Sequence, residues 1–217
     1  MEMNNRFFYV FVNIKGALYT ADWVKFTQSA IQEHEDPTYR ENVNMLLKKH
    51  PEWSKYYHSQ GYNRSKSIRK ICPNNIDSLN RLLDDLKLDY DVNLVITSPK
   101  WKDSFDIKTL PALVKNGLNY KNLVIDKTNN RDEDICSGIK SYLTQVGNPD
   151  TYIVIDYQDN VCSSFDSNKI IKVDQYSSGL NNTLVDEYLD SVVYADSELE
   201  MEESDTFGFE LDNFVTE

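Results

Sequence analysis

Polar and charged residues, in one case with a glycine, follow each of four apolar segments in this sequence, at the point where the segment ends. Those positions hold Asn13, Lys15, Gly16, Thr97, Ser98, Lys127, Thr128, Asp156 and Asp159. In phosphate sites, hydroxyls and loop amides bind the oxygens, cations neutralise them, and carboxylates hold Mg²⁺. If the segments are neighbouring strands, the sequence predicts a site for a phosphorylated ligand, with Asp156 and Asp159 on the side of a metal ion.

Simpler interpretations exist for two of these places. A hydroxyl directly after a strand is also the usual N-cap of the following helix, which would account for Thr97 and Ser98 without a ligand. The ammonium group of Lys15 could point into solvent or pair with Asp156, and for this residue the sequence favours that interpretation. The recurrence of ligand-binding residue types at four segment ends favours a common site.

Hydrophobic patterning predicts the elements that would bring these residues together. Five short segments are almost entirely apolar, as expected for strands buried on both faces: residues 7–12, 92–96, 123–125, 152–155 and 170–173. Apolar residues recur at helical spacing in segments 76–86, 135–143 and 180–189, the second with Asn130 as its expected N-cap. The alternation predicts an α/β fold with a Rossmann-like parallel sheet, in which ligands bind beyond the carboxyl ends of the strands.

Two segments lie outside this pattern. Residues 22–74 are too long for one crossover between parallel strands, and they predict a helical cap inserted above the sheet. Residues 195–217 hold nine acids and no lysine or arginine, which leaves only −3 of the net charge of −12 for residues 1–194. They predict an acidic, flexible C-terminal tail. The expected α/β core comprises residues 1–21 and 75–194.

Several of the segments resemble motifs of the haloacid dehalogenase (HAD) superfamily. VFVNIKGAL at 10–18 is similar to the first HAD motif, a strand followed by D-x-D-G-x-L, and VITSPKW at 95–101 to the second motif of the HAD domains associated with RNA-repair proteins. KT at 127–128 with RDEDI at 131–135, YIVIDY at 152–157 and SGL at 178–180 are similar to later motifs of those domains. The resemblance implies a HAD-like fold and adds Arg131 to the ligand-binding residues.

The chain differs from the family pattern at the positions of the family's catalytic residues. The resemblance aligns the nucleophilic aspartate with Asn13, the acid/base aspartate with Lys15, and the second aspartate of a D-D pair with Tyr157. An amide is a poor nucleophile, and an ammonium group cannot serve as acid and base unless its pKa is strongly lowered. These degenerate motifs predict no catalytic residue and weakened Mg²⁺ binding.

We therefore expect a catalytically inactive HAD-like protein that binds a phosphorylated ligand or a macromolecular partner. The ligand-binding residues would be Asn13, Lys15, Thr97, Ser98, Lys127 and Arg131. The alternative is a HAD-type phosphohydrolase that acts on nucleotides or nucleic-acid ends, an expectation that follows from the resemblance alone.

A basic and aromatic stretch lies within the predicted insertion. Between Lys48 and Lys70 there are seven basic residues and one acid, and four rings are interleaved with them: Trp53, Tyr56, Tyr57 and Tyr62. Cations beside stackable rings are typical of single-stranded nucleic-acid binding. The rings could instead pack a core of the insertion, which the acidic overall charge favours. The stretch could also bind the tail through four of the tail's apolar residues, Phe207, Phe209, Leu211 and Phe214.

Composition excludes other classes of protein. The longest apolar run has six residues, too short to span a membrane or to form a secretory signal. Three distant cysteines without a CxxC pattern argue against disulfides and zinc–thiolate sites and favour a reducing, cytoplasmic location. The abundance of Asn, Tyr and Ile is consistent with an AT-rich genome such as that of a phage or other virus, in which case the location is the host cytoplasm.

Overall fold

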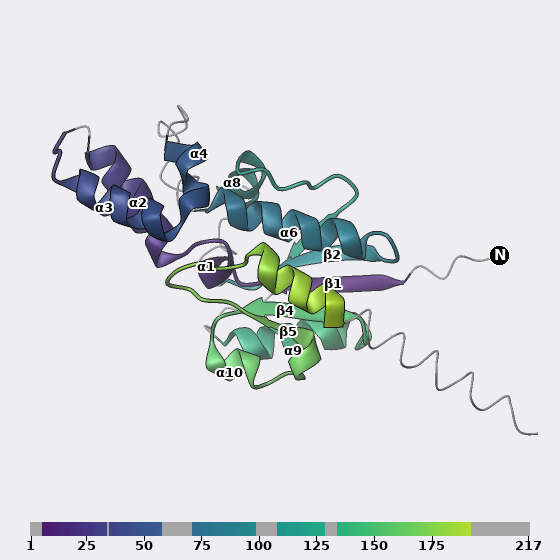
Figure 1. Cartoon of the computed structure of the whole chain (residues 1–217). Coiled ribbons are helices and arrows are strands. Elements are labelled where there is room, and N and C mark those ends of the chain that lie inside the picture. Colours follow the sequence, from purple (N-terminus) through teal and green to yellow (C-terminus); the bar gives the residue numbers. More distant parts are fainter. Residues whose placement is uncertain (1–5, 34, 58–70, 99–107, 129–133, 192–217) are drawn as a thin grey trace, which may run out of the picture.

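The computed structural model describes residues 6–33, 35–57, 71–98, 108–128 and 134–191. A five-stranded, all-parallel sheet in the order β3-β2-β1-β4-β5 lies at its centre (Figure 1). The strands are β1 (Phe7–Val12), β2 (Asp91–Ile96), β3 (Val124–Lys127), β4 (Tyr152–Asp156) and β5 (Ile170–Lys172). Each overlaps one of the five predicted apolar segments, so the predicted α/β fold with a Rossmann-like parallel sheet is confirmed.

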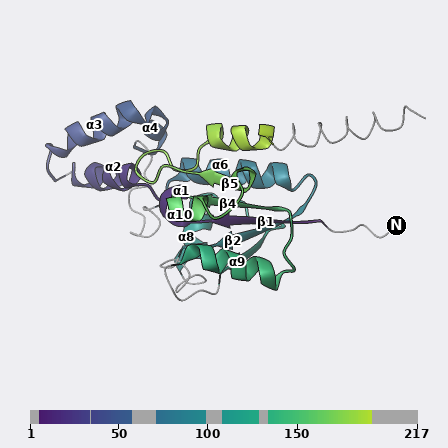
Figure 2. The same cartoon turned by 90° about the horizontal axis from the view of Figure 1, so that it is seen from below.

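The side chains of β1 alternate between two hydrophobic clusters, one on each face of the sheet. Phe8, Val10 and Val12 belong to the cluster that includes residues of α6 (Pro73–Leu86) and α8 (Leu110–Lys115). Tyr9 and Phe11 belong to the cluster of α9 (Ile135–Gln145) and α10 (Asp159–Cys162). Figure 2 shows α6 and α9 on opposite sides of the sheet. Because successive residues of a strand face opposite ways, a strand between two layers of helices must be apolar throughout.

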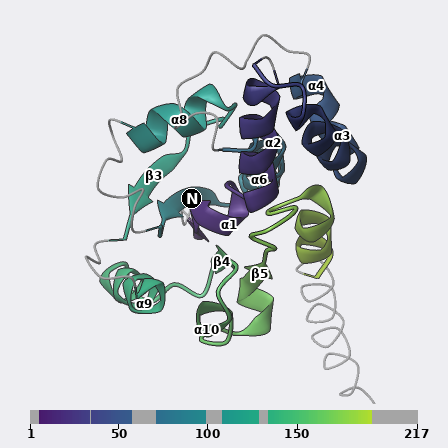
Figure 3. The same cartoon turned by 90° about the vertical axis from the view of Figure 1, so that its left-hand side faces the viewer.

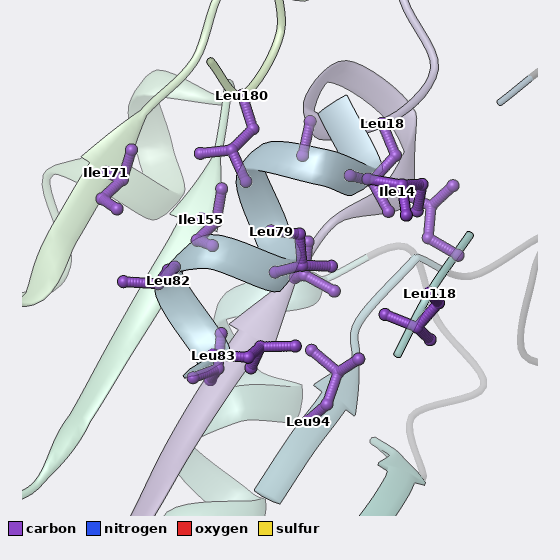
Figure 4. Packing of buried hydrophobic residues seen from close by; sticks show 14 of the residues in the cluster. Ile14, Leu18, Leu79, Leu82, Leu83, Leu94, Leu118, Ile155, Ile171 and Leu180 are labelled. Carbon is purple, nitrogen blue, oxygen red and sulfur yellow. The ribbon is translucent and has the colours of Figure 1, made fainter. Parts of the chain in front are cut away.

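Helix α6 packs on one face of the sheet. Pro73 occupies its first turn, where a missing amide proton breaks no hydrogen bond, and buried leucines recur along one face. Leu79, Leu82 and Leu83 lie in the same cluster as Leu94 of β2 and Ile155 of β4 (Figure 4). This packing ties β2 and β4 together through the helix that covers them.

Residues 21–57 form a helical segment with its own hydrophobic cluster. It contains α2 (Ala21–Gln32), α3 (Tyr39–Lys49), the 3₁₀ turn η1 (Pro51–Trp53) and the short α4 (Ser54–Tyr57). Trp23, Phe26 and Trp53 pack together with ring centroids 5.1–5.5 Å apart. Figures 1 and 3 show these helices beyond the carboxyl ends of the strands, next to α6.

Two of the predicted helices differ in detail from the structure. Helix α9 begins at Ile135, and the carboxylate of Asp134 accepts a hydrogen bond from Ser137 N at 3.1 Å, so Asp134 rather than Asn130 is its N-cap. The pattern at 180–189 corresponds to helical residues 182–191, with Leu180 just before the helix. No helix in the described ranges has the length and apolar character needed to cross a membrane.

Candidate functional site

The carboxyl ends of β2, β1 and β4 meet at one edge of the sheet. We call Asn13, Thr97, Ser98 and Asp156 at this edge the rim. The parallel ladder continues into it: Thr97 N donates to Val12 O at 3.1 Å, and Asn13 N donates to Ile155 O at 3.0 Å. All four residues are buried. The structure therefore brings together the predicted residues that follow three adjacent strands.

A chain of side-chain hydrogen bonds crosses the rim. Ser98 Oγ donates to Asn13 Oδ1 at 2.6 Å, and Asn13 Nδ2 donates to Asp156 Oδ2 at 3.0 Å. The side chain of Asn13 thus acts as an acceptor toward one neighbour and as a donor toward the other. An amide provides both functions without carrying a charge.

Asp156 is a carboxylate without solvent contact that is satisfied by the chain itself. Its Oδ1 accepts hydrogen bonds from Tyr157 N at 2.7 Å and from Gln158 N at 2.9 Å, while Oδ2 accepts from Asn13. Burial raises the pKa of this carboxyl, and the three hydrogen bonds offset part of that effect. The bonds stabilise a buried negative charge without a cation.

The hydroxyl of Thr97 differs from the rest of the rim. Thr97 is 1% exposed, and among the buried side-chain polar atoms of the described residues its Oγ1 is the one that lacks a hydrogen-bond partner. A buried, unsatisfied hydroxyl costs about 1–3 kcal/mol. The N-cap interpretation of Thr97 would require its hydroxyl to accept a backbone amide, so it does not account for this group.

The described residues do not fit the Mg²⁺ ion that the family resemblance implies. Both oxygens of Asp156 already accept hydrogen bonds, and Asp159 lies exposed with its Oδ1 2.6 Å from Lys172 Nζ. Within the described part of the chain, no group of three or more His, Cys, Asp or Glu side chains is arranged to hold a metal ion. At the rim, an amide donor binds the carboxylate, whereas a metal ion would bind the carboxylate oxygens directly.

The backbone turns sharply directly after Asn13. In α1 (Ile14–Ala17), Lys15 has a ψ of 126° and Gly16 a φ of +90°, a conformation that favours glycine. A Cβ at Gly16 would overlap the ring of Tyr157. The turn leaves Lys15 exposed, with its Nζ 5.5 Å from the centroid of that ring. Lys15 thus lies at the surface, and its contact is Tyr157 rather than Asp156.

Other predicted site residues follow β3 or lie outside the described residues. Lys127 and Thr128 are at the end of β3, and Thr128 N donates to Ile96 O at 3.1 Å, which places Thr128 beside Thr97 of the rim. Lys127 is partly buried and Thr128 is buried. Arg131 lies outside the described residues.

Asn75 is a residue of the site region that the sequence did not indicate. Its buried side-chain amide donates to Ala17 O at 2.7 Å and to Ser178 O at 2.9 Å. It thereby joins the turn after β1 to the segment that contains Gly179, where a Cβ would meet Asn75 itself. An asparagine in the first turn of a helix has no distinguishing sequence signal, because its two acceptors are remote in the chain.

The rings in the described part of the basic stretch pack on the hydrophobic cluster of the helical segment. Trp53 is 2% exposed and packs between Trp23 and Phe26. Tyr56 and Tyr57 lie against the same cluster and donate their hydroxyl protons to Asn74 Oδ1 and Glu33 Oε2, both at 2.7 Å. Trp53 therefore belongs to the core of the helical segment and the two tyrosines pack against it, while nucleic-acid binding by the basic stretch stays a prediction. Tyr62 and residues 58–70 lie outside the described residues.

These features were compared with those of known proteins by sequence and by structure. Searches against protein-family models, curated proteins and solved structures gave no significant match for this chain.

Proposed function

We propose that this chain is a catalytically inactive HAD-like protein whose rim binds a phosphorylated ligand. The observation that carries the proposal is the side chain of Asn13, which is 2% exposed and has both polar atoms engaged by Ser98 and Asp156. A neutral amide in this state can orient neighbouring groups, but it has no free electron pair basic enough to attack phosphorus.

Two further observations support ligand binding rather than a purely structural rim. The hydroxyl of Thr97 is buried next to Asn13 without a hydrogen-bond partner, and a phosphate oxygen would satisfy it. An exposed ammonium group, Lys15, lies two residues from Asn13 and supplies positive charge. Beyond the carboxyl ends of parallel strands, such groups are typical of ligand sites.

Two assays on the full chain test the proposal. We expect no turnover of small phosphoesters or mononucleotides in the presence of Mg²⁺, and we expect inorganic phosphate or a mononucleotide to raise the melting temperature in a dose-dependent way. Thr97→Val should weaken that shift, because it removes the hydroxyl and keeps the shape. Thr97→Ser is the control, since it retains the hydroxyl.

The opposite outcomes are equally clear. Mg²⁺-dependent turnover that disappears in Asn13→Ala would establish the alternative function, a phosphohydrolase. A melting temperature that no phosphorylated compound changes would exclude the rim as a phosphate site.

A further inference from the structure

Two of the residues that depart from the family pattern contact each other. Lys15 and Tyr157 are 142 positions apart in the sequence, yet Lys15 Nζ lies over the Tyr157 ring, 5.5 Å from its centroid. The ion pairs of lysine and arginine among the described residues involve Arg40, Lys49, Lys55, Arg81, Lys87 and Lys172, and not Lys15. The charge of Lys15 is thus held by a ring and not neutralised by a carboxylate.

The backbone of Tyr157 is held by the rim, and its ring lies against the turn after β1. Tyr157 directly follows Asp156, and its backbone N donates to Asp156 Oδ1 at 2.7 Å. One side of the ring lies so close to Gly16 that a Cβ there would overlap it. Because Gly16 follows Lys15, the same turn positions both the ammonium group of Lys15 and the ring that it contacts.

Among the described residues, the carboxylate at this place is already engaged by hydrogen bonds. The carboxylate of Asp156 accepts three hydrogen bonds, one of them from the amide of Asn13. A metal would have to displace those donors and approach the ammonium group of Lys15 against like charge. The same place favours an anion, because it offers an exposed ammonium group and the unpartnered hydroxyl of Thr97 near Asn13.

We propose that Lys15 and Tyr157 form one unit that binds a phosphate group without a divalent cation. The proposal rests on the proposed function and adds the mode of recognition. Lys15 contacts the phosphate oxygens, and Tyr157 is a positioning residue that holds the ammonium group by a cation–π contact. The ligand class is inorganic phosphate or a phosphate monoester in its metal-free form.

The test is a calorimetric titration of the full chain with inorganic phosphate, in EDTA and in excess Mg²⁺. We expect equal affinity in the two buffers. Lys15→Gln should weaken binding about tenfold or more, as for the loss of a charged hydrogen bond. Lys121→Gln is the matched control, because Lys121 is an exposed lysine that precedes β3 at the amino edge of the sheet.

The role of Tyr157 has its own pair of variants. Tyr157→Leu should weaken phosphate binding about two- to fivefold, whereas Tyr157→Phe, which keeps the ring, should bind as the wild type does. Tyr152→Leu is the control, because Tyr152 has Lys169 Nζ at the same 5.5 Å but begins β4 at the opposite edge. In the wild type, NMR should also show an upfield ring-current shift of the Lys15 side-chain protons, which tests the contact even if Tyr157→Leu does not fold.

The outcomes separate this inference from the proposed function. Binding that requires Mg²⁺, equal binding by Tyr157→Leu and wild type, or Lys15 protons without a ring-current shift would each overturn the Lys15–Tyr157 unit and leave the rim as a phosphate site. No binding of phosphate or a mononucleotide in either buffer would overturn the proposed function itself.

Discussion

Asn13 determines the electrostatic state of the rim. Its amide donates to the buried carboxylate of Asp156 and accepts from Ser98, so one negative charge is balanced by hydrogen bonds alone. An aspartate at the same position would remove the donor and add a second carboxylate about 3 Å from the first, where like charges in a low dielectric repel strongly. The neutral amide therefore suits a rim that functions without a metal.

Asn13→Asp should consequently destabilise the fold at neutral pH. We expect a loss of at least about 2 kcal/mol at about pH 7, because a buried acceptor loses its donor and faces another charge. Burial already raises the pKa of Asp156, and the second carboxyl would raise it further, so one proton is shared in the folded state. The pKa of this carboxyl pair would then be higher in the folded variant than in the unfolded one. The variant therefore keeps its stability below the unfolded pKa and loses it as the pH rises through the folded pKa.

Chemical denaturation at about pH 7 and about pH 5 checks this sign. The deficit of Asn13→Asp relative to the wild type should shrink at the lower pH. Asn44→Asp, an exposed change on α3 with the same charge difference, is the control. If Asn13→Asp is as stable as Asn44→Asp at neutral pH, the Asn13–Asp156 bond does not organise the rim.

At the scale of elements, the turn after β1 links the sheet to the Lys15–Tyr157 contact. Gly16 and Gly147 both have a φ of +90°, but they differ in what a side chain would meet. A Cβ at Gly147 would have nothing within 4 Å, whereas at Gly16 it would overlap the Tyr157 ring. A comparison of Gly147 with Gly16 therefore separates the cost of backbone strain from the cost of a steric overlap.

Gly147→Ala should cost about 1–2 kcal/mol, the usual penalty of a left-handed conformation for a residue with a Cβ. Gly16→Ala should cost more than Gly147→Ala and should also weaken phosphate binding, because Tyr157 must move away from the turn. Denaturation curves and phosphate titrations of the two variants provide the comparison. Equal stability losses and unchanged binding in Gly16→Ala would show that the ring tolerates displacement.

For the whole molecule, charge is distributed unevenly along the chain. Residues 195–217 hold nine acids without a lysine or arginine, and they also hold Phe207, Phe209, Leu211 and Phe214. Apolar rings among repelling acids are a pattern of segments that dock on a partner. The docking of this segment stays a prediction, since residues 192–217 lie outside the described residues.

The prediction is that its rings contribute more to docking than its charges. Phe207→Ala with Phe209→Ala should expose the segment to protease more completely than Glu202→Gln with Glu203→Gln, because apolar burial supplies most of the holding energy and exposed charges are screened by salt. Limited proteolysis and hydrogen exchange of residues 195–217 measure the difference. Full exchange of this segment in the wild type, alone and with every co-purifying partner, would show that it only solubilises the chain.

The sequence by itself determined the sheet and the edge at which the rim lies. A strand covered by helices on both faces has to be apolar throughout, so β1 lies where the apolar run 7–12 does. In a parallel sheet all carboxyl ends share one edge, which is why Asn13, Thr97 and Asp156 could be expected together.

Tertiary structure alone decided the contacts among these residues. The Asn13–Asp156 bond, the Lys15–Tyr157 contact and the bonds of Asn75 join positions between 58 and 143 residues apart, and no local pattern specifies such pairs. The same holds for Trp53, whose ring among lysines has the composition of a nucleic-acid surface but is buried against Trp23. Residue type and local spacing limit what a side chain can do, and which partners it meets depends on how distant segments pack.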